Sequence, residues 1–284
     1  MTETAVLQEE TFQTRDGRTI LLRTCEGFEE FDACVALQIE TWGYADGDVI
    51  PRRVFTVARK IGGQVIGAFD LSLSGNSEPQ AAHMIGFAMA LPGMKTAKRG
   101  VPVAYLHSHM LAVRGAYRND GVGRRLKLFQ RVEALARGID LMEWTFDPLE
   151  IKNSFLNIHR LGAIVRSYTP NFYGVSSSRL QGGLPTDRLH AEWYLRSERV
   201  EAVLNGNSKK SGLIEETILL PREIGEWKAS EEHIDRALAV QRENHQRFQA
   251  AFSRGLAVTG FRRDAEGNGI FELEPFEGEG VYEN

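Results

Sequence analysis

The chain has 284 residues, with 34 Lys plus Arg against 38 Asp plus Glu and a formal net charge of −4. This length predicts one large or two modest domains, because a domain usually holds roughly 100–200 residues. A composition of 42% hydrophobic and 25% charged residues is typical of globular proteins and excludes a mainly disordered or collagen-like chain. The weakly acidic balance gives no indication of a nucleic-acid or anionic-membrane partner.

The first residues, M-T-E-T-A-V-L-Q-E-E, lack a basic segment followed by an apolar one. No uninterrupted apolar run reaches the roughly 18 residues that a membrane span needs. We therefore expect a cytoplasmic protein that neither enters nor crosses a membrane. Its two cysteines, Cys25 and Cys34, are expected to be reduced thiols in that compartment.

The N-terminal part predicts a strand over 18–24 and a helix from Glu26 to Thr41, where apolar residues recur at spacings of three and four. Gly43 is the predicted end of this helix. Residues 53–60 and 64–73 flank I-G-G, which is typical of a β-hairpin. A further strand over 82–91 is expected to end at the loop P-G-M-K-T-A-K-R-G, which would place three antiparallel strands in succession.

A long apolar strand is predicted over 101–113, and the segment R-G-A-Y-R-N-D-G-V-G-R-R-L follows it directly. Helical spacing then runs from Val122 to Gly138. A strand at 139–148 and a helix at about 149–161, closed by Gly162, complete this part. The order strand, helix, three strands, helix, strand, helix predicts an α+β fold with a mixed central sheet flanked by helices.

The polar run L-N-G-N-S-K-K-S-G at 204–212 is the best candidate for a domain boundary. It divides the chain into a first domain, 1–204, and a C-terminal extension, 213–284. The extension predicts a strand at 216–221, a helix at 230–253 and a closing hairpin. About 72 residues are marginal for an independent core, so we expect the extension to dock on the first domain.

A strand that runs straight into R-N-D-G-V-G-R at a helix start is suited to binding phosphate. Gly121 and Gly123 allow the backbone to approach a ligand, and the N–H groups of the first helical turn point toward it. Arg118, Arg124 and Arg125 add positive charge. The segment matches neither the dinucleotide fingerprint nor the P-loop. A tight turn before a capped helix remains an equal alternative on this pattern alone.

The string L-A-V-R-G-A-Y-R-N-D-G-V-G-R-R-L at 111–126 resembles the acyl-CoA signature of the GNAT superfamily of N-acyltransferases. Arg118, Gly121 and Gly123 fill its defining positions, and Val113 ends the preceding strand at the expected distance. The order of elements over about 15–170 also fits. Further segments resemble a little-characterised branch of predicted acetyltransferases in that superfamily: E-T-W-G (40–43), W-T-F-D-P-L (144–149), N-S-F-L-N-I-H-R-L-G-A (153–163) and L-P-T-D-R-L (184–189).

The resemblance implies an enzyme that moves an acyl group from a CoA thioester, with acetyl-CoA as the expected co-substrate, to the amine of a small molecule or protein. It implies that a bulge frees backbone groups of the signature strand for the pantetheine arm, around Leu111, Ala112 and Val113. The pyrophosphate would be held by the N–H groups of Asn119, Asp120, Gly121, Val122, Gly123 and Arg124. The arm would enter beside the strand at 139–146, with Asn153 as a further ligand. No metal, nucleic acid or membrane partner is expected, and a homodimer is one option for assembly.

His107 and His109 share one face of the signature strand by its period of two. An imidazole with an ordinary pKa near 6.5 suits a general base that takes the proton of the attacking amine. A pair of hydrogen-bonded core histidines is the first alternative. A metal site completed by another side chain is the second, with three candidate ligands: His83, Asp147 and His159.

The tyrosine that the family usually has four residues before the closing glycine is Ile158 here. This departure leaves the general acid unidentified, and it motivates the alternative of a non-catalytic acyl-CoA-binding module. Tyr168 and Tyr173 are candidate substitutes or core residues. Asp147 is expected either to bind a substrate ammonium or to cap the next helix.

Two more features leave alternatives open. Asn153 and Asn157 lie one turn apart, on one helix face that is either functional or simply solvated. Asp187 and Arg188 lie within a long Gly-rich loop, 174–189, that is expected to be a lid, a substrate-binding segment or a flexible connector.

Overall fold

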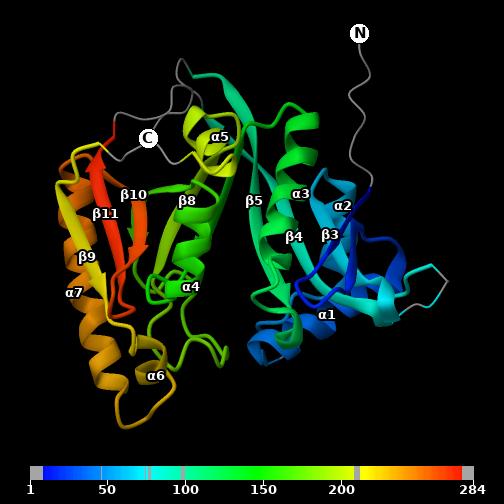
Figure 1. Cartoon of the computed structure of the whole chain (residues 1–284), viewed down its shortest axis with the longest axis horizontal. Coiled ribbons are helices and arrows are strands. Elements are labelled where there is room, and N and C mark those ends of the chain that lie inside the picture. Colours follow the sequence, from blue (N-terminus) through cyan, green and yellow to red (C-terminus); the bar gives the residue numbers. More distant parts are fainter. Residues whose placement is uncertain are drawn as a thin grey trace. The chain divides into compact units, whose positions relative to one another are not determined.

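The computed structural model describes residues 9–45, 47–73, 75, 78–96, 100–207 and 212–276. Its contacts divide the chain into two compact units, Met1–Met142 and Glu143–Asn284 (Figure 1). The predicted boundary at 204–212 therefore falls within the second unit, and residues 208–211 of that run lie outside the described residues.

The first unit contains five strands whose order in the sheet is the order in the chain. Each strand pairs antiparallel with the next. The strands are β1 (Glu9–Gln13), β2 (Thr19–Thr24), β3 (Gln64–Asp70), β4 (Met84–Thr96) and β5 (Pro102–Val113). Short 3-10 turns follow β3, precede β4 and follow β5: η1 (Leu71–Leu73), η2 (Ala81–His83) and η3 (Gly115–Tyr117). β3 is buried along its whole length, which places it at the centre of the core.

The predicted end of the strand at residue 91 is wrong, because β4 continues through Pro92 to Thr96. The last residue of β4 that pairs with β3 is Ala90, whereas pairing with β5 continues to Thr96 opposite Pro102. Among the described strands, the part of β4 beyond Ala90 therefore pairs with β5 alone. Proline is tolerated there because its missing N–H breaks no ladder on the open side.

Helices cover both faces of this sheet. On one face, α1 (Gly27–Trp42) and α2 (Arg52–Lys60) bury Phe31, Cys34 and Phe55 in a cluster with strand residues such as Phe87 and Met110. On the other face, α3 (Val122–Ala136) buries three residues at helical spacing, Val122, Leu126 and Phe129. The predicted helices at 26–41 and 122–138 are confirmed.

The predicted hairpin over 53–73 is wrong in its first arm, because residues 52–60 form α2. The β-branched residues of R-V-F-T-V favour a strand locally. Phe55 and Ala58, however, lie three apart and are both fully buried, with the Phe55 ring packed against Phe31. Gly62, at φ +89°, lies just past the helix end in the left-handed region. The glycine pair therefore ends a helix instead of turning a hairpin.

A bulge in β5 reverses which residues face each side of the sheet. The pairing register shifts between Met89, opposite Met110, and Ala90, opposite Ser108, so His109 is the extra residue. Before the bulge, the Ser108 hydroxyl bonds to side chains of α3. After it, Met110 packs in the cluster with α1 and α2, and Leu111 turns toward α3. An extra residue in one strand shifts the alternation by one position.

The second unit forms its own part of the sheet, in the order β6-β8-β7-β10-β11-β9. Its strands are β6 (Leu141–Phe146), which begins just before the division, β7 (Ile164–Thr169), β8 (Arg188–Tyr194), β9 (Glu216–Leu220), β10 (Leu256–Arg263) and β11 (Gly269–Pro275). Its helices are α4 (Ile151–Ser154), continued by the π-helical segment η4 (Phe155–Arg160), then α5 (Glu198–Leu204), α6 (Ile224–Lys228) and α7 (Ile234–Ser253). The fold is α+β, as predicted.

The C-terminal extension packs against the residues that precede it within this unit. Val258 of β10 pairs with Val165 of β7, and Phe248 of α7 stacks near Tyr168 at a ring distance of 5.8 Å. The strand at 216–221, the helix at 230–253 and the closing hairpin are confirmed. Of the described helices, none combines the length and apolar character needed to cross a bilayer.

Candidate functional site

The turn between β5 and α3 has an unusual backbone. Asn119 has φ +71°, and Gly121, which immediately precedes α3, has φ +83°. Both lie in the left-handed region, which asparagine and glycine tolerate best. We call residues 115–124, from η3 to the first turn of α3, the phosphate loop. Its sequence predicts a glycine-dependent turn here, and the structure has one.

The first turn of α3 has no side-chain cap and no acidic residue. The α5 helix of the same chain differs, because the Ser197 hydroxyl accepts from the Val200 N–H and two glutamates lie in its first turn. Within 121–125, the Arg125 N–H bonds to the Gly121 carbonyl and so closes the first helical turn. Amides at a helix start that has no side-chain cap are suited to an anion. The N-cap residue is Gly121, so the tight turn of the alternative is present and the first-turn amides have no side-chain acceptor.

Three residues attach the phosphate loop to the sheet and the core. The Arg118 Nε donates to the Val113 carbonyl at 3.2 Å, so the loop is held to the end of β5. Val122 is 1% exposed and fixes the helix start in the core. A Cβ built on Gly123 would lie 3.4 Å from the Leu111 side chain, an ordinary van der Waals contact, so the start of α3 packs against β5.

Two charged residues at the phosphate loop and the start of α3 are paired with residues from the N-terminal part of the chain. Arg125 pairs with Glu10 at 2.7 Å, which partly neutralises its charge. The Asp120 carboxylate lies 3.4 Å from the Arg18 guanidinium, and its side chain is 17% exposed. Neither Glu10 nor Arg18 is signalled by the motif, because Glu10 lies in β1 and Arg18 in the turn between β1 and β2.

His107 and His109 lie close together on β5, with ring centres 6.2 Å apart. Ser108 points to α3, so His107, which precedes the bulge, lies on the opposite face, and the ring distance places the bulge residue His109 beside it. Burial lowers the pKa of His109 below its ordinary value of 6.5. His109 is therefore neutral at pH 7 and able to accept a proton.

We predict that His109 makes stability fall in mild acid. Because its pKa is lowered in the folded state, the unfolded chain takes up this proton first as the pH falls below 6.5. The free energy of unfolding of the wild type should decrease over this range more steeply than that of His109→Gln, as measured by urea unfolding between pH 7 and pH 5. Equal slopes for both proteins would contradict the burial of a neutral imidazole.

The metal-site alternative finds no support in the described residues, where no group of three or more His, Cys, Asp or Glu side chains could hold a metal ion. Two of its candidate ligands have other partners. His159 stacks on Phe155 at a ring distance of 4.4 Å, and Asp147 binds Lys228.

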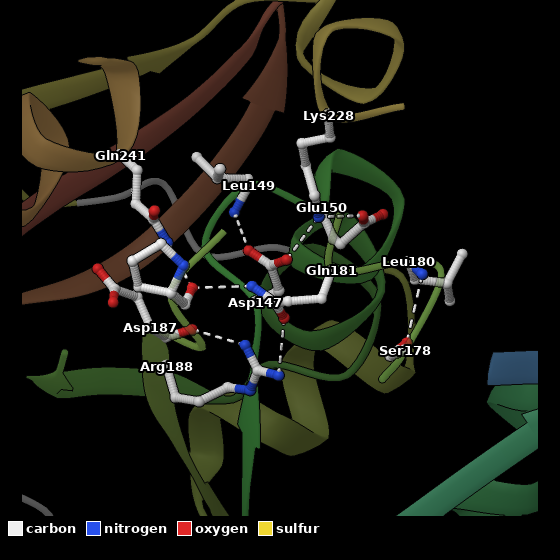
Figure 2. Close-up of polar contacts among 11 residues, drawn as sticks. Asp147, Leu149, Glu150, Ser178, Leu180, Gln181, Asp187, Arg188, Lys228 and Gln241 are labelled. Atoms are coloured by element: carbon white, nitrogen blue, oxygen red, sulfur yellow. Dashed lines mark hydrogen bonds and ion pairs between the residues drawn. The ribbon is translucent and has the colours of Figure 1, made fainter. Parts of the chain in front are cut away.

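Asp147 lies in a polar cluster of the second unit, which Figure 2 shows. Its Oδ1 accepts from the Leu149 N–H at 2.8 Å, in the turn before α4, so it does not cap that helix, whose N-cap residue is Glu150 and has no side-chain cap bond. Its Oδ2 accepts from the Lys228 Nζ at 2.6 Å, and Lys228 also donates to Glu150 at 2.9 Å. An ammonium group of the chain itself thus occupies the carboxylate that is the candidate for a substrate ammonium. The two carboxylates raise the pKa of Lys228 despite its burial.

Asp187 organises the segment before β8. Its carboxylate accepts from the Tyr168 hydroxyl at 2.5 Å and from the Asn171 N–H at 2.9 Å. Arg188 donates to the Asp187 carbonyl and to Gln181 (Figure 2). Asp187 is 5% exposed, so it acts inside the fold. Nothing in these contacts marks Asp187 or Arg188 as a ligand for substrate.

Tyr168 is a poor substitute for the missing general acid. Burial and the hydrogen bond to Asp187 raise the pKa of its phenol. Tyr173 is 46% exposed, and its hydroxyl lies 2.9 Å from that of Thr145. Ile158 is 1% exposed, so the position that resembles the family's tyrosine belongs to the core.

We expect Tyr168→Phe to lower the free energy of unfolding by about 1–3 kcal/mol, because it leaves a buried carboxylate without one of its donors. Tyr173→Phe removes a hydroxyl that also bonds to a side chain, but at an exposed position, and should change stability by less than about 0.5 kcal/mol. Thermal unfolding of both variants measures the difference. An equal loss of unfolding free energy in Tyr173→Phe and Tyr168→Phe would contradict the claim that burial of the hydrogen bond sets its contribution to stability.

Asn153 and Asn157 share a helix face as predicted, since the Asn157 amide donates to the Asn153 Oδ1 at 3.3 Å. Asn157 is 2% exposed, so this face is not simply solvated. Asn153 belongs to the second unit, whereas the phosphate loop belongs to the first. The bond from Asn153 to a pantetheine arm stays a prediction.

Comparison with known proteins gives likenesses of structure only. No protein-family model matches the sequence, and no curated protein matches it significantly. Solved structures that are similar include NAA60 of Arabidopsis thaliana in complex with a bisubstrate analogue, at 14% identity and a TM-score of 0.48, covering 62% of this chain and 97% of that one. They also include the ribosomal-protein-S18-alanine N-acetyltransferase of Escherichia coli, at 16% identity and a TM-score of 0.43, covering 63% and 95%. Another is a GNAT family acetyltransferase of Elizabethkingia anophelis with acetyl-CoA bound, at 14% identity and a TM-score of 0.43, covering 62% of this chain and 97% of that one.

Proposed function

We propose that the protein is an acyl-CoA-dependent N-acyltransferase, with acetyl-CoA as its donor. The phosphate loop is the observation that carries this proposal. It joins a bulged strand to an uncapped helix start through two left-handed residues, and it does so at the positions that resemble the acyl-CoA signature. Backbone N–H groups from Asn119 to Arg124 would hold the pyrophosphate of CoA.

The bulge supports the part of the proposal that concerns the pantetheine arm. An extra residue disrupts the regular ladder and bends the strand, which is how backbone groups become available to a ligand. The bulge is at His109, two residues before Leu111. Leu111 to Val113 pair with β4 beyond the bulge, so the candidates for bonds to the arm are the backbone groups that these residues turn away from β4.

The reaction would be direct attack of an acceptor amine on the thioester carbon. The nitrogen–carbon bond forms, the carbon–sulfur bond breaks, and the electron pair leaves with the CoA thiolate. A base must take the proton of the amine, and His109 is the candidate; burial lowers its pKa, which keeps it neutral at pH 7 and also makes it a weaker base than a free imidazole. A thiol with an ordinary pKa near 8.5 leaves readily, so an acid contributes less than the base does.

One observation favours a second candidate, a module that binds acyl-CoA without turnover. The buried Ile158 stands at the position where the resembled family has its tyrosine. Tyr168, a buried tyrosine ten residues later, donates its hydroxyl to Asp187 instead. On this alternative the phosphate loop keeps its role, and His107 and His109 are core residues.

Two measurements test the proposal. Isothermal titration with acetyl-CoA should show saturable binding, and absence of binding up to millimolar concentration would overturn both candidates. Release of free thiol from acetyl-CoA in the presence of a panel of peptide and small-molecule amines separates them. Amine-dependent release that is lost in the His109→Gln variant supports the enzyme, and binding with no release above background by any amine favours the module.

A further inference from the structure

Three side chains in contact with one another hold the phosphate loop, and we call them the loop support: Arg18, Asp70 and Tyr117. Tyr117 belongs to η3, within the loop itself, and is 9% exposed. Its hydroxyl donates to the Asp70 Oδ2 at 2.7 Å, at the end of β3. The Arg18 guanidinium lies 3.9 Å from the centre of the Tyr117 ring, in a cation–π contact.

Arg18 also bonds to the loop directly. Its Nη2 donates to the Ala116 carbonyl at 3.2 Å and to the Asp120 carboxylate at 3.4 Å. The same nitrogen pairs with Asp16 at 2.6 Å, in the turn between β1 and β2. One guanidinium thus connects this turn, the aromatic ring and the acidic residue of the loop.

The contact between Arg18 and Asp120 favours anion binding at the phosphate loop. A carboxylate inside a loop that faces a pyrophosphate is unfavourable, because like charges repel. Arg18 places a positive charge against that carboxylate and at the same time fixes the peptide at Ala116. The left-handed residues Asn119 and Gly121 come shortly after Ala116 in the chain. Groups that are held before binding cost less to order when a ligand arrives.

We propose that Arg18 is a positioning residue for the CoA pyrophosphate, which acts through Tyr117 and Asp120 and does not itself take part in acyl transfer. This inference rests on the proposed function. It adds that affinity for the pyrophosphate part of CoA, and not for the pantetheine part, depends on the loop support.

The test compares Arg18→Gln with two other variants of the full chain. Tyr117→Phe removes only the hydroxyl that bonds to Asp70. Arg52→Gln is the matched control, because Arg52 also pairs with a carboxylate, Asp32 at 2.9 Å, and lies 5.0 Å from an aromatic ring, Phe28. The change of charge is the same, and Arg52 belongs to α2. Circular dichroism and thermal unfolding establish that each variant is folded.

Affinities for CoA and for pantetheine, which lacks the pyrophosphate, are measured by NMR titration, since this method reads millimolar binding. Arg18→Gln should weaken CoA binding about tenfold, the scale of a lost charge-assisted contact, and leave pantetheine binding within about twofold of the wild type. Tyr117→Phe should change affinity in the same direction, and Arg52→Gln should change neither ligand. If Arg18→Gln does not fold, the affinities of Tyr117→Phe for CoA and pantetheine alone test the proposal.

Two results would overturn the positioning role. One is CoA affinity within twofold of the wild type in both loop-support variants. The other is an equal loss for CoA and pantetheine, which indicates general damage to the fold. Failure of the wild type itself to bind CoA is a different outcome, because it overturns the proposed function and this inference with it.

Discussion

Gly121→Ala is expected to weaken CoA binding more than tenfold and to lower the free energy of unfolding by about 1–2 kcal/mol. Gly121 has φ +83°, and no heavy atom lies within 4 Å of the point that a Cβ would occupy, so the cost comes from the backbone and not from a clash. Alanine relieves the strain by moving toward negative φ, which redirects the amides of the first turn of α3. Calorimetric titration measures the affinity, and urea unfolding measures the stability.

Gly138→Ala is the matched control for this prediction. Gly138 lies just past the other end of α3, at φ +73°, and also has open space around it. Its replacement should cost a similar free energy of unfolding and leave CoA affinity within about twofold, because it is far along the helix from the loop. Equal losses of affinity in the two variants would mean that strain in α3, and not the geometry of the phosphate loop, controls binding.

Lys228→Met is expected to have the largest effect on stability, a loss of about 3–5 kcal/mol. The Lys228 side chain is 4% exposed, and the carboxylate that it binds at 2.6 Å, on Asp147, is 11% exposed. Removal of the ammonium leaves Asp147 charged and largely buried, and Glu150 loses a donor as well. Urea unfolding at pH 7 measures this loss.

The control is Arg222→Met in the same unit. Arg222 pairs with Glu223 at 2.7 Å, but its side chain is 62% exposed, so its loss of stability should be small beside that of Lys228→Met. Equal losses in the two variants would contradict the role of burial.

Alkaline pH gives a second test of the Lys228 ion pairs. The raised pKa of Lys228 means that its contribution is complete below 10.5 and is lost as the pH rises through the higher folded value. Stability of the wild type should therefore fall more steeply above pH 10.5 than that of Lys228→Met.

The spacing of apolar residues along the sequence predicts those elements in which a single periodicity, helical or alternating, is clear. The helix at 26–41 and the helix at 122–138 are predictable because their apolar residues recur at helical spacing. The α2 helix is not, because Val54, Thr56 and Val57 favour a strand and only burial of Phe55 and Ala58 against distant residues decides for a helix. The continuation of β4 past Ala90 likewise depends on its partner strand.

The candidate site divides in the same way. Gly121 can be identified from the motif, because its left-handed backbone favours glycine, whereas a Cβ at Gly123 would make only an ordinary contact of 3.4 Å with Leu111. Arg18 and Lys228 cannot, since each reaches its partner across a long stretch of chain, about 100 residues for Arg18 and Asp120 and about 80 for Lys228 and Asp147. A guanidinium on a turn or a lysine on a short helix has no local signal that distinguishes it from a solvated charge.

The most direct test of the central claim is an NMR titration of the isotopically labelled wild type with CoA, in which the backbone amides are followed one by one. Binding of the pyrophosphate at the phosphate loop predicts saturable shifts that are largest for the amides from Asn119 to Arg124, with smaller shifts from Leu111 to Val113. Saturable shifts that leave these amides unchanged, or no shifts at millimolar CoA, would contradict the account.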